Sequence, residues 1–205
     1  MANSDYNVLY CGYSVEETEV YLCALVNEQY SQEQAQQILD ALNMARRAHQ
    51  NQLRCNNDPY FIHPMRVALM LLNFDKNTIS KVLIAALLHD TVEKTSITSA
   101  EIEKCFGWYV AKLVQSVTRQ HDESQSSLEK TEAKYQNWLE VISSSHEVRM
   151  IKVGEDLDNM ICWKSIPECD LGWGKIPRWM EEADTMSLPL AELTNLAVYS
   201  VMRQE

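Results

Sequence analysis

The side chains of this sequence best suited to chemistry are His89 and Asp90, an adjacent imidazole and carboxylate that follow an apolar run. That run, Val82 to Leu88, contains no charged residue, so the pair is expected at the end of a helix that is buried on most sides. An unpaired polar group buried there costs on the order of 1–3 kcal/mol, and a divalent ion such as Mn, Fe, Co or Zn would satisfy both side chains. From the pair alone, a hydrogen-bonded core histidine followed by a helix-end cap fits equally well.

A second His-Asp pair, His121 and Asp122, provides an internal comparison. It lies in the polar stretch 120–127, and no apolar helix leads into it. We therefore expect this pair to lie in a solvated loop and not to form a site.

The elements that must position His89 and Asp90 are predicted to be helices. Three S/T-x-x-E/Q capping boxes mark helix starts: Ser14 with Glu17, Ser31 with Gln34, and Thr98 with Glu101. Apolar residues recur every three to four positions over 38–48, 65–72, 78–90, 108–118, 128–142, 148–161 and 178–202, the last run broken at Pro189. Gly107 is expected to end the helix that Thr98 begins, while 51–64 and 163–177 are expected to be irregular. No segment indicates a strand, so the fold class is all-α.

Composition narrows the classes of protein further. The 205 residues carry a net charge of -11 and a sequence pI of about 4.9, which argues against nucleic-acid binding. The longest apolar run is far shorter than the roughly 20 residues that cross a bilayer, so no membrane span is expected. Six cysteines without a C-x-x-C pair, and no visible signal peptide, predict reduced thiols in a cytoplasmic protein. No linker divides the chain, which predicts one domain: a helical extension over 1–30 and the main body with a C-terminal helical segment over 31–205.

Several separated stretches resemble successive motifs of the RelA/SpoT hydrolase domain, in order and spacing. They are A-H-x-x-Q-x-R-x-x-x-x-P-Y-x-x-H-P over 48–64, A-A-L-L-H-D-x-x-E-x-T over 85–95, F-G-x-x-V-A-x-L-V-x-x-V-T over 106–118 and K-V-G-E-D-L-D-N-M over 152–160. The last is similar to that family's K-L-A-D-R-L-H-N-M, and 189–191 is similar to the P-L-A that follows. The resemblance covers about residues 38–160 and weakens afterwards.

The resemblance implies a helical HD domain that binds Mn(II), or another divalent transition metal, and removes pyrophosphate from the 3′ position of guanosine tetra- or pentaphosphate. Its metal ligands would be His63, His89, Asp90 and Glu155. A divalent ion with open positions can acidify water toward a pKa of ~7 for attack on a phosphoryl group.

The resemblance also implies further roles. The family's catalytic acidic pair falls at Glu93 and Lys94, Arg54 falls where the family contacts the guanine base, and Asn159 falls where it contacts the nucleotide near the metal. Lys152 would add positive charge for the substrate. With no synthetase region after residue 205, the chain is expected to be a stand-alone alarmone hydrolase. Apart from the resemblance, Trp163, Trp173 and Trp179 are expected to cover a cleft rather than to stack on a base.

Three departures fall inside the implied site. Lys94 replaces the second catalytic acid, Glu155 has one methylene more than the family's metal aspartate, and 154–156 reads Gly-Glu-Asp where the family has Ala-Asp-Arg. Asp156 is a competing ligand candidate, although on a helix it points about 100° away from Glu155. Two alternatives therefore stay open: a hydrolase of another nucleotide or phosphate ester, and a degenerate HD domain that serves as a nucleotide-binding or regulatory module.

Overall fold

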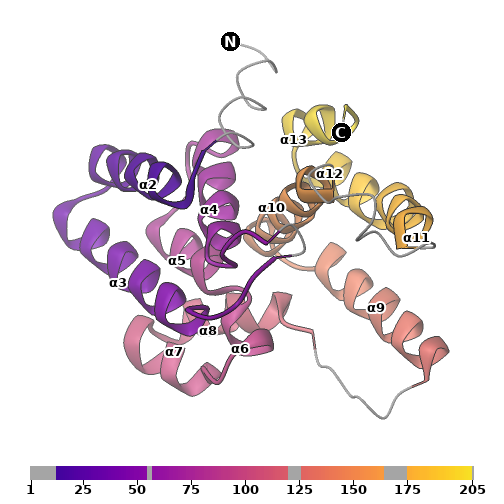
Figure 1. Cartoon of the computed structure of the whole chain (residues 1–205), viewed down its shortest axis with the longest axis horizontal. Coiled ribbons are helices and arrows are strands. Elements are labelled where there is room, and N and C mark those ends of the chain that lie inside the picture. The colour runs from indigo at the N-terminus through magenta and orange to yellow at the C-terminus, as the bar shows by residue number, and fades with distance from the viewer. Residues whose placement is uncertain (1–12, 55–56, 120–125, 164–174, 205) are drawn as a thin grey trace.

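The computed structural model describes residues 13–54, 57–119, 126–163 and 175–204, which fold into a bundle of helices (Figure 1). No strand occurs among these residues, and one isolated antiparallel bridge joins Leu53 to Pro59. The all-α prediction is confirmed.

The helices are α2 (Val15–Gln29), α3 (Gln32–Ala48), α4 (Ile62–Phe74), α5 (Ser80–Leu88), α6 (Thr91–Lys94), α7 (Ser99–Phe106), α8 (Trp108–Val117), α9 (Ser127–Ile142), α10 (His146–Trp163), α11 (Lys175–Glu182), α12 (Leu188–Thr194) and α13 (Leu196–Met202), with a π-helical turn, η1 (Ala183–Ser187), between α11 and α12. Of these described helices, none is long and apolar enough to cross a membrane.

The predicted helix starts are confirmed by their hydrogen bonds. At Ser14, Ser31 and Thr98 the side-chain oxygen accepts a hydrogen bond from the backbone N–H three residues later. The Glu or Gln side chain at that later position accepts one from the backbone N–H of the capping residue. Gly107 ends α7 with a φ of 88°, a backbone conformation that favours glycine. A fourth box, at Ser126, starts α9.

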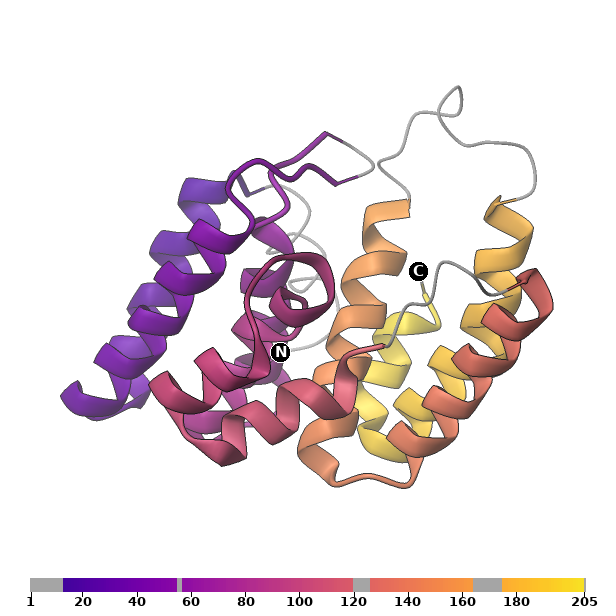
Figure 2. The same ribbon diagram turned by 90° about the horizontal axis from the view of Figure 1, so that it is seen from below.

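Helix α5 lies at the centre of the core. Val82 to Leu88 are all buried, and α3, α4 and α8 pack around them. Figures 1 and 2 place α10 between these N-terminal helices and the layer that contains α9, α11 and α12. The buried helix predicted to lead into His89 and Asp90 is therefore the central one.

The first turn of α4 begins earlier than predicted. We expected a loop over 51–64 followed by a helix from residue 65, but α4 starts at Ile62 and includes His63 and Pro64. A proline in a first turn loses no helical hydrogen bond, because N–H groups there have no partner within the helix. The prediction of an irregular segment over 163–177 is wrong at both ends, because Trp163 is the last residue of α10 and α11 begins at Lys175. Residues 164–174 lie outside the described residues, as does the pair His121–Asp122.

The break in the C-terminal helical run lies at a different residue from the one predicted. Pro189 is the second residue of α12 and is accommodated after the π-helical turn, whereas the run breaks at Asn195, which has φ −157° and ψ 109°. The Asn195 side chain accepts from Ala197 N at 3.0 Å and Val198 N at 3.2 Å, and this starts α13. The helical run therefore breaks where the Asn195 side chain caps a new helix, and not at the proline.

Gly154 lets α10 approach α4 closely. A Cβ at this position would overlap Met70 Cε and lie 3.1 Å from Val67 Cγ1. We expect Gly154→Val to lower the free energy of unfolding by about 1–3 kcal/mol, because the buried side chains of α4 would have to shift. Gly154→Ala is the matched control: its gain of about 1 kcal/mol in helix propensity offsets the cost of moving the flexible Met70 terminus. Urea unfolding measures both; equal stability of Gly154→Val and the parent would contradict the expected overlap.

Candidate metal centre

Two helix ends bring three of the four expected metal ligands together. His63 lies in the first turn of α4, and His89 and Asp90 form the turn between α5 and α6. All three side chains are buried, and one possible ligand atom from each lies within 4.8 Å of the others. Among the described residues, this is the group of His, Cys, Asp and Glu side chains that could hold a metal ion.

The imidazole rings of His63 and His89 face each other through their Nε2 atoms. His63 Nδ1 lies 2.6 Å from Asp158 Oδ2, and His89 Nδ1 lies 2.8 Å from the carbonyl oxygen of Ala86. Since both partners are acceptors, each Nδ1 carries the proton and each Nε2 presents a lone pair. These two Nε2 atoms are 3.2 Å apart, and Asp90 Oδ2 lies 3.5 Å and 3.3 Å from them.

This arrangement calls for a positive charge between the rings. Two lone pairs and a carboxylate oxygen that point at one another are satisfied by a shared proton or by a cation. Two imidazole nitrogens and one carboxylate oxygen fit a borderline divalent transition metal, and the three side chains leave positions open for water or substrate. The residues present therefore fit the expected ion.

The electrostatics of the centre keep His63 and Asp90 in the form that binds a metal, and they favour a proton on His89. Burial, assisted by Arg54, lowers the pKa of His63 to about 4, so this ring is neutral. Burial opposes ionisation of Asp90, but His89 and Lys94 outweigh it and hold the pKa of Asp90 well below its usual range. Burial also opposes charge on His89, and the Asp90 carboxylate outweighs it and raises the pKa of His89.

Glu155, the fourth expected ligand, is turned toward cations of the protein. Its buried carboxylate lies 2.9 Å from Lys152 Nζ and 3.5 Å from Arg119 Nη2. Burial would raise the pKa of Glu155, but Lys152 and Arg119 lower it to about 2. Asp156, the competing candidate, lies 2.9 Å from the same Lys152 Nζ. Neither carboxylate joins the three-residue group, so a ligand role for Glu155 stays a prediction.

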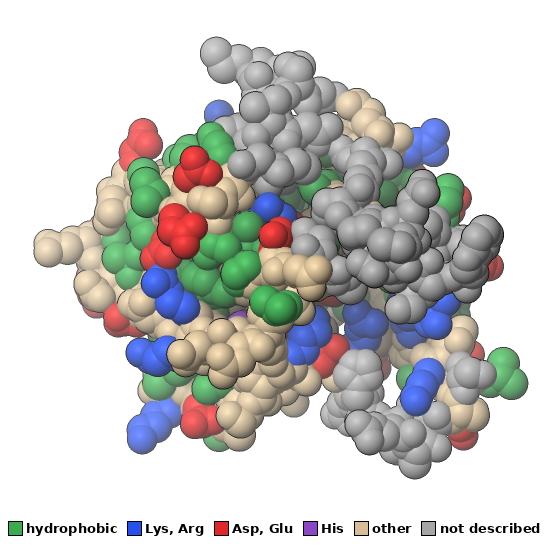
Figure 3. All heavy atoms as spheres, in the orientation of Figure 1, with side chains coloured by type: hydrophobic (Ala, Val, Ile, Leu, Met, Phe, Trp, Pro, Cys, Tyr) green, Lys and Arg blue, Asp and Glu red, His purple; other side chains and the backbone are tan. Residues whose placement is uncertain are grey.

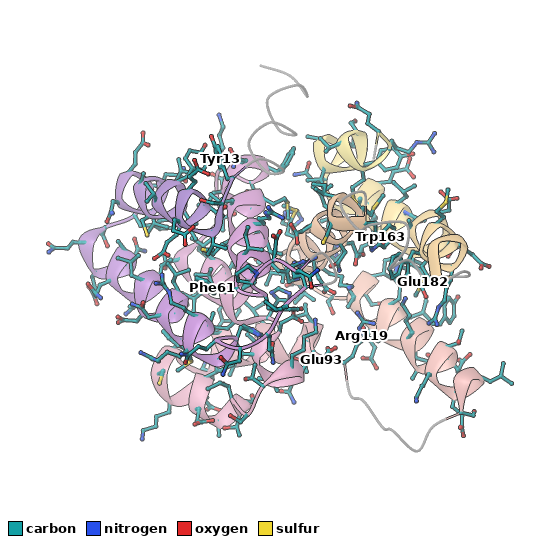
Figure 4. The ribbon with its side chains drawn as sticks, in the orientation of Figure 1. Tyr13, Phe61, Glu93, Arg119, Trp163 and Glu182 are labelled. Carbon is teal, nitrogen blue, oxygen red and sulfur yellow. The ribbon has the colours of Figure 1, made fainter. Side chains whose placement is uncertain are left out.

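The expected catalytic pair, Glu93 and Lys94, is split between two surroundings. Glu93 Oε2 accepts from the backbone N–H of Arg119 at 2.9 Å, and Figure 4 shows these two residues side by side. Lys94 Nζ lies 2.7 Å from Asp90 Oδ1 and donates to Tyr60 Oη at 2.6 Å. Tyr60 in turn donates to Asp90 Oδ2 at 2.5 Å. An ammonium group therefore already binds a carboxylate that is expected to hold the metal.

The two expected substrate contacts lie next to each other. Arg54 Nη2 donates to Asn159 Oδ1 at 3.1 Å, and the guanidinium lies over the Tyr60 ring, 5.8 Å from its centroid. The loop before α4 positions this arginine, because Arg54 N donates to Asp58 O at 2.8 Å and Tyr60 N to Gln52 O at 2.8 Å.

A cleft of about 480 Å³ adjoins the centre at Glu155 and Asn159. Four cationic side chains line it: Arg119, Lys134, Lys152 and Arg178. Trp163 and Trp179 also line it and stack with ring centroids 5.2 Å apart, as expected for residues that cover a cleft; Trp173 lies outside the described residues. Figure 3 shows Lys and Arg side chains gathered near α9 on the face it displays. Three carboxylates, Glu155, Asp156 and Glu182, also line the cleft and pair with these cations, so its lining has four positive and three negative side chains although the chain is acidic overall.

Sequence reasoning missed two contributors to this site. They are Asp158, which accepts a hydrogen bond from His63, and Arg119, which lies beside Glu155. The signal for Asp158 was available, since an acidic residue stands there in place of the family's histidine. No local signal marks Arg119, which reaches Glu155 from the end of a different helix.

Comparison with known proteins agrees with this geometry. The family model described as HD domain matches residues 41–169. The chain therefore belongs to the HD domain family. Within that family it is similar to the guanosine-3′,5′-bis(diphosphate) 3′-pyrophosphohydrolases.

The relatives differ in how much of their length the chain spans. The MESH1 pyrophosphohydrolase of Danio rerio is 33% identical over 172 residues, which cover 82% of this chain and 91% of that protein. The pyrophosphohydrolase of Aquifex aeolicus is 39% identical over 131 residues, but these are only 18% of its length. A solved structure of a metazoan ortholog of SpoT that hydrolyses ppGpp aligns with a TM-score of 0.70 and 28% identity, covering 82% of this chain and 94% of that one.

Proposed function

We propose that this chain is a metal-dependent phosphohydrolase that removes pyrophosphate from the 3′ position of guanosine tetra- or pentaphosphate. The observation that carries the proposal is the pair of Nε2 lone pairs on His63 and His89, which face Asp90 beside a cation-lined cleft. The names of the relatives support the substrate. We propose Mn(II) as the ion, a cytoplasmic location, and no nucleic-acid or membrane partner. Residues 31–205 are the proposed HD unit, with 1–30 as an extension.

His63, His89 and Asp90 would hold the ion, with Glu155 as the proposed fourth ligand. A divalent ion there supplies a Lewis acid that stabilises negative charge on a phosphoryl group. This role requires a neutral His63 and an ionised Asp90, the forms that the surroundings of these side chains favour.

The remaining residues would bind the nucleotide and move a proton. In the proposed reaction, water forms a bond to the phosphorus attached to the ribose 3′ oxygen, the bond between that phosphorus and the 3′ oxygen breaks, and the 3′ oxygen takes up a proton from water. Pyrophosphate leaves, together with the nucleoside 5′-diphosphate from the tetraphosphate or the 5′-triphosphate from the pentaphosphate. Glu93 is the proposed acceptor of the water proton. Arg54 and Asn159 would contact the nucleoside, and the cleft cations would neutralise phosphate oxygens.

The direct test is turnover of the alarmone by the purified chain supplied with Mn(II). Guanosine 3′,5′-bis(diphosphate) is expected to yield equal amounts of GDP and pyrophosphate, separated by ion-exchange chromatography. GTP, which has no 3′ phosphate, is the matched control and should stay intact. Comparable hydrolysis of GTP would favour another phosphohydrolase, and an intact alarmone in the presence of bound metal would contradict hydrolysis of this substrate.

A second candidate function is favoured by one contact. Because Lys94 neutralises Asp90 at 2.7 Å and stands where the family has an acid, the chain could bind a nucleotide without turning it over. In that case the cleft would serve a nucleotide-binding or regulatory module. Alarmone affinity measured by calorimetry, together with the absence of turnover, distinguishes this candidate from the hydrolase.

A further inference from the structure

Asp158 lies in the centre without being one of its expected ligands. It is on α10, three residues after Glu155, and is 4% exposed. Its Oδ2 atom accepts from His63 Nδ1 at 2.6 Å, the contact that leaves Nε2 of this ring facing His89 and Asp90. The family motif has histidine at this position, so the carboxylate is a departure of this chain from that motif.

Two arginines fix the Asp158 carboxylate from other sides. Arg54 Nη2 lies 3.2 Å from Oδ2, the same oxygen that binds His63. Arg66 Nη1 lies 3.7 Å from Oδ1, which has no hydrogen-bond partner among the described residues. The short hydrogen bond of this carboxylate is therefore the one to the imidazole, and the arginines hold it in place for that bond.

We propose that Asp158 is a positioning residue that sets the metal affinity of the centre through His63. A carboxylate on Nδ1 fixes which ring nitrogen carries the proton, locks the ring orientation and makes Nε2 a stronger donor to a cation. The inference rests on the proposed metal centre but not on the proposed substrate. A purely structural role predicts something different: Asp158 would only neutralise two buried arginines, and metal affinity would not depend on it.

The test compares Asp158→Asn with Glu147→Gln. Both variants remove one negative charge from α10, but Glu147 lies in the first turn of this helix, beside His146 and Arg149 and not beside His63. Mn(II) affinity, measured by competition with a chelator, is expected to fall about 10–100-fold for Asp158→Asn and to change little for Glu147→Gln. Thermal unfolding without metal checks that both are folded. Equal Mn(II) affinities in folded variants would overturn the proposal, whereas a parent chain that binds no Mn(II) would overturn the metal centre itself.

A measurement on the parent chain covers the case in which Asp158→Asn does not fold. Long-range ¹H–¹⁵N spectra of the histidine rings in the metal-free protein report which nitrogen is protonated, and His63→Gln assigns the signal. We expect the His63 proton on Nδ1, in a hydrogen bond that slows its exchange with water. A proton on Nε2 of His63 would contradict the proposed role of Asp158.

Discussion

His89→Ala is expected to lower Mn(II) affinity by more than about 100-fold and to remove alarmone hydrolysis together with it. Loss of a residue that only supports a ligand costs about 10–100-fold, and loss of the ligand itself costs more. His63, Asp90 and the proposed ligand Glu155 would remain, and the loss of one of the two imidazole nitrogens weakens binding of a transition metal. Bound Mn(II) per chain, measured after desalting, and GDP release give the two readouts.

The control for this prediction is His146→Ala. His146 is 47% exposed at its side chain and lies 3.9 Å from Asp75, away from the metal centre. The His146→Ala variant should bind Mn(II) with the affinity of the parent chain. His89→Gln, which keeps more of the buried volume, separates a folding defect from the loss of a ligand. Full Mn(II) binding by folded His89→Gln would show that the ion binds elsewhere.

Lys94→Asp is expected to raise the rate of alarmone hydrolysis by about 100-fold or more, within the range of a positioned general acid or base. Two effects act in the same direction. The substitution removes an ammonium group 2.7 Å from Asp90 Oδ1, and it supplies the second acid that the family motif has at this position. The rate under single-turnover conditions, with Mn(II) saturating, measures the change without a contribution from product release.

Lys94→Met separates these two effects, because it removes the charge without adding an acid. If methionine raises the rate as much as aspartate, the ammonium group on Asp90 is the inhibitory feature. If only aspartate raises it, the missing acid limits the parent chain. A fall in rate for both variants would contradict the prediction and would make Lys94 a working part of the site.

Much of the helical framework could be predicted from the sequence because its signals are local. A capping box such as Ser31 with Gln34 involves residues three apart, and the apolar run before His89 specifies a buried helix by itself. The break at Asn195 was missed because proline is the stronger general breaker. Proline near a helix start is tolerated, however, and the asparagine side chain could cap the next helix.

The site was predictable only in part, because its geometry depends on contacts between distant residues. His63 and His89 were found from their motifs, and the structure brings them together. The alignment with the family motif placed Glu155 near them, but it could not reveal that Lys152 and Arg119, which lies two residues after α8, bind its carboxylate. Nor could that alignment reveal that Asp158 accepts a hydrogen bond from Nδ1 of the His63 ring.

The facing imidazoles also tie the stability of the fold to its ligand. The groups that meet there come from α4, from the turn after α5 and, through Asp158, from α10, and in an unfolded chain they are separated by long stretches of sequence. An ion that binds only the folded form stabilises it by mass action, by about 2.7 kcal/mol when its free concentration is 100 times the dissociation constant. The supply of metal would then regulate how much of this protein is folded, as well as what it can do.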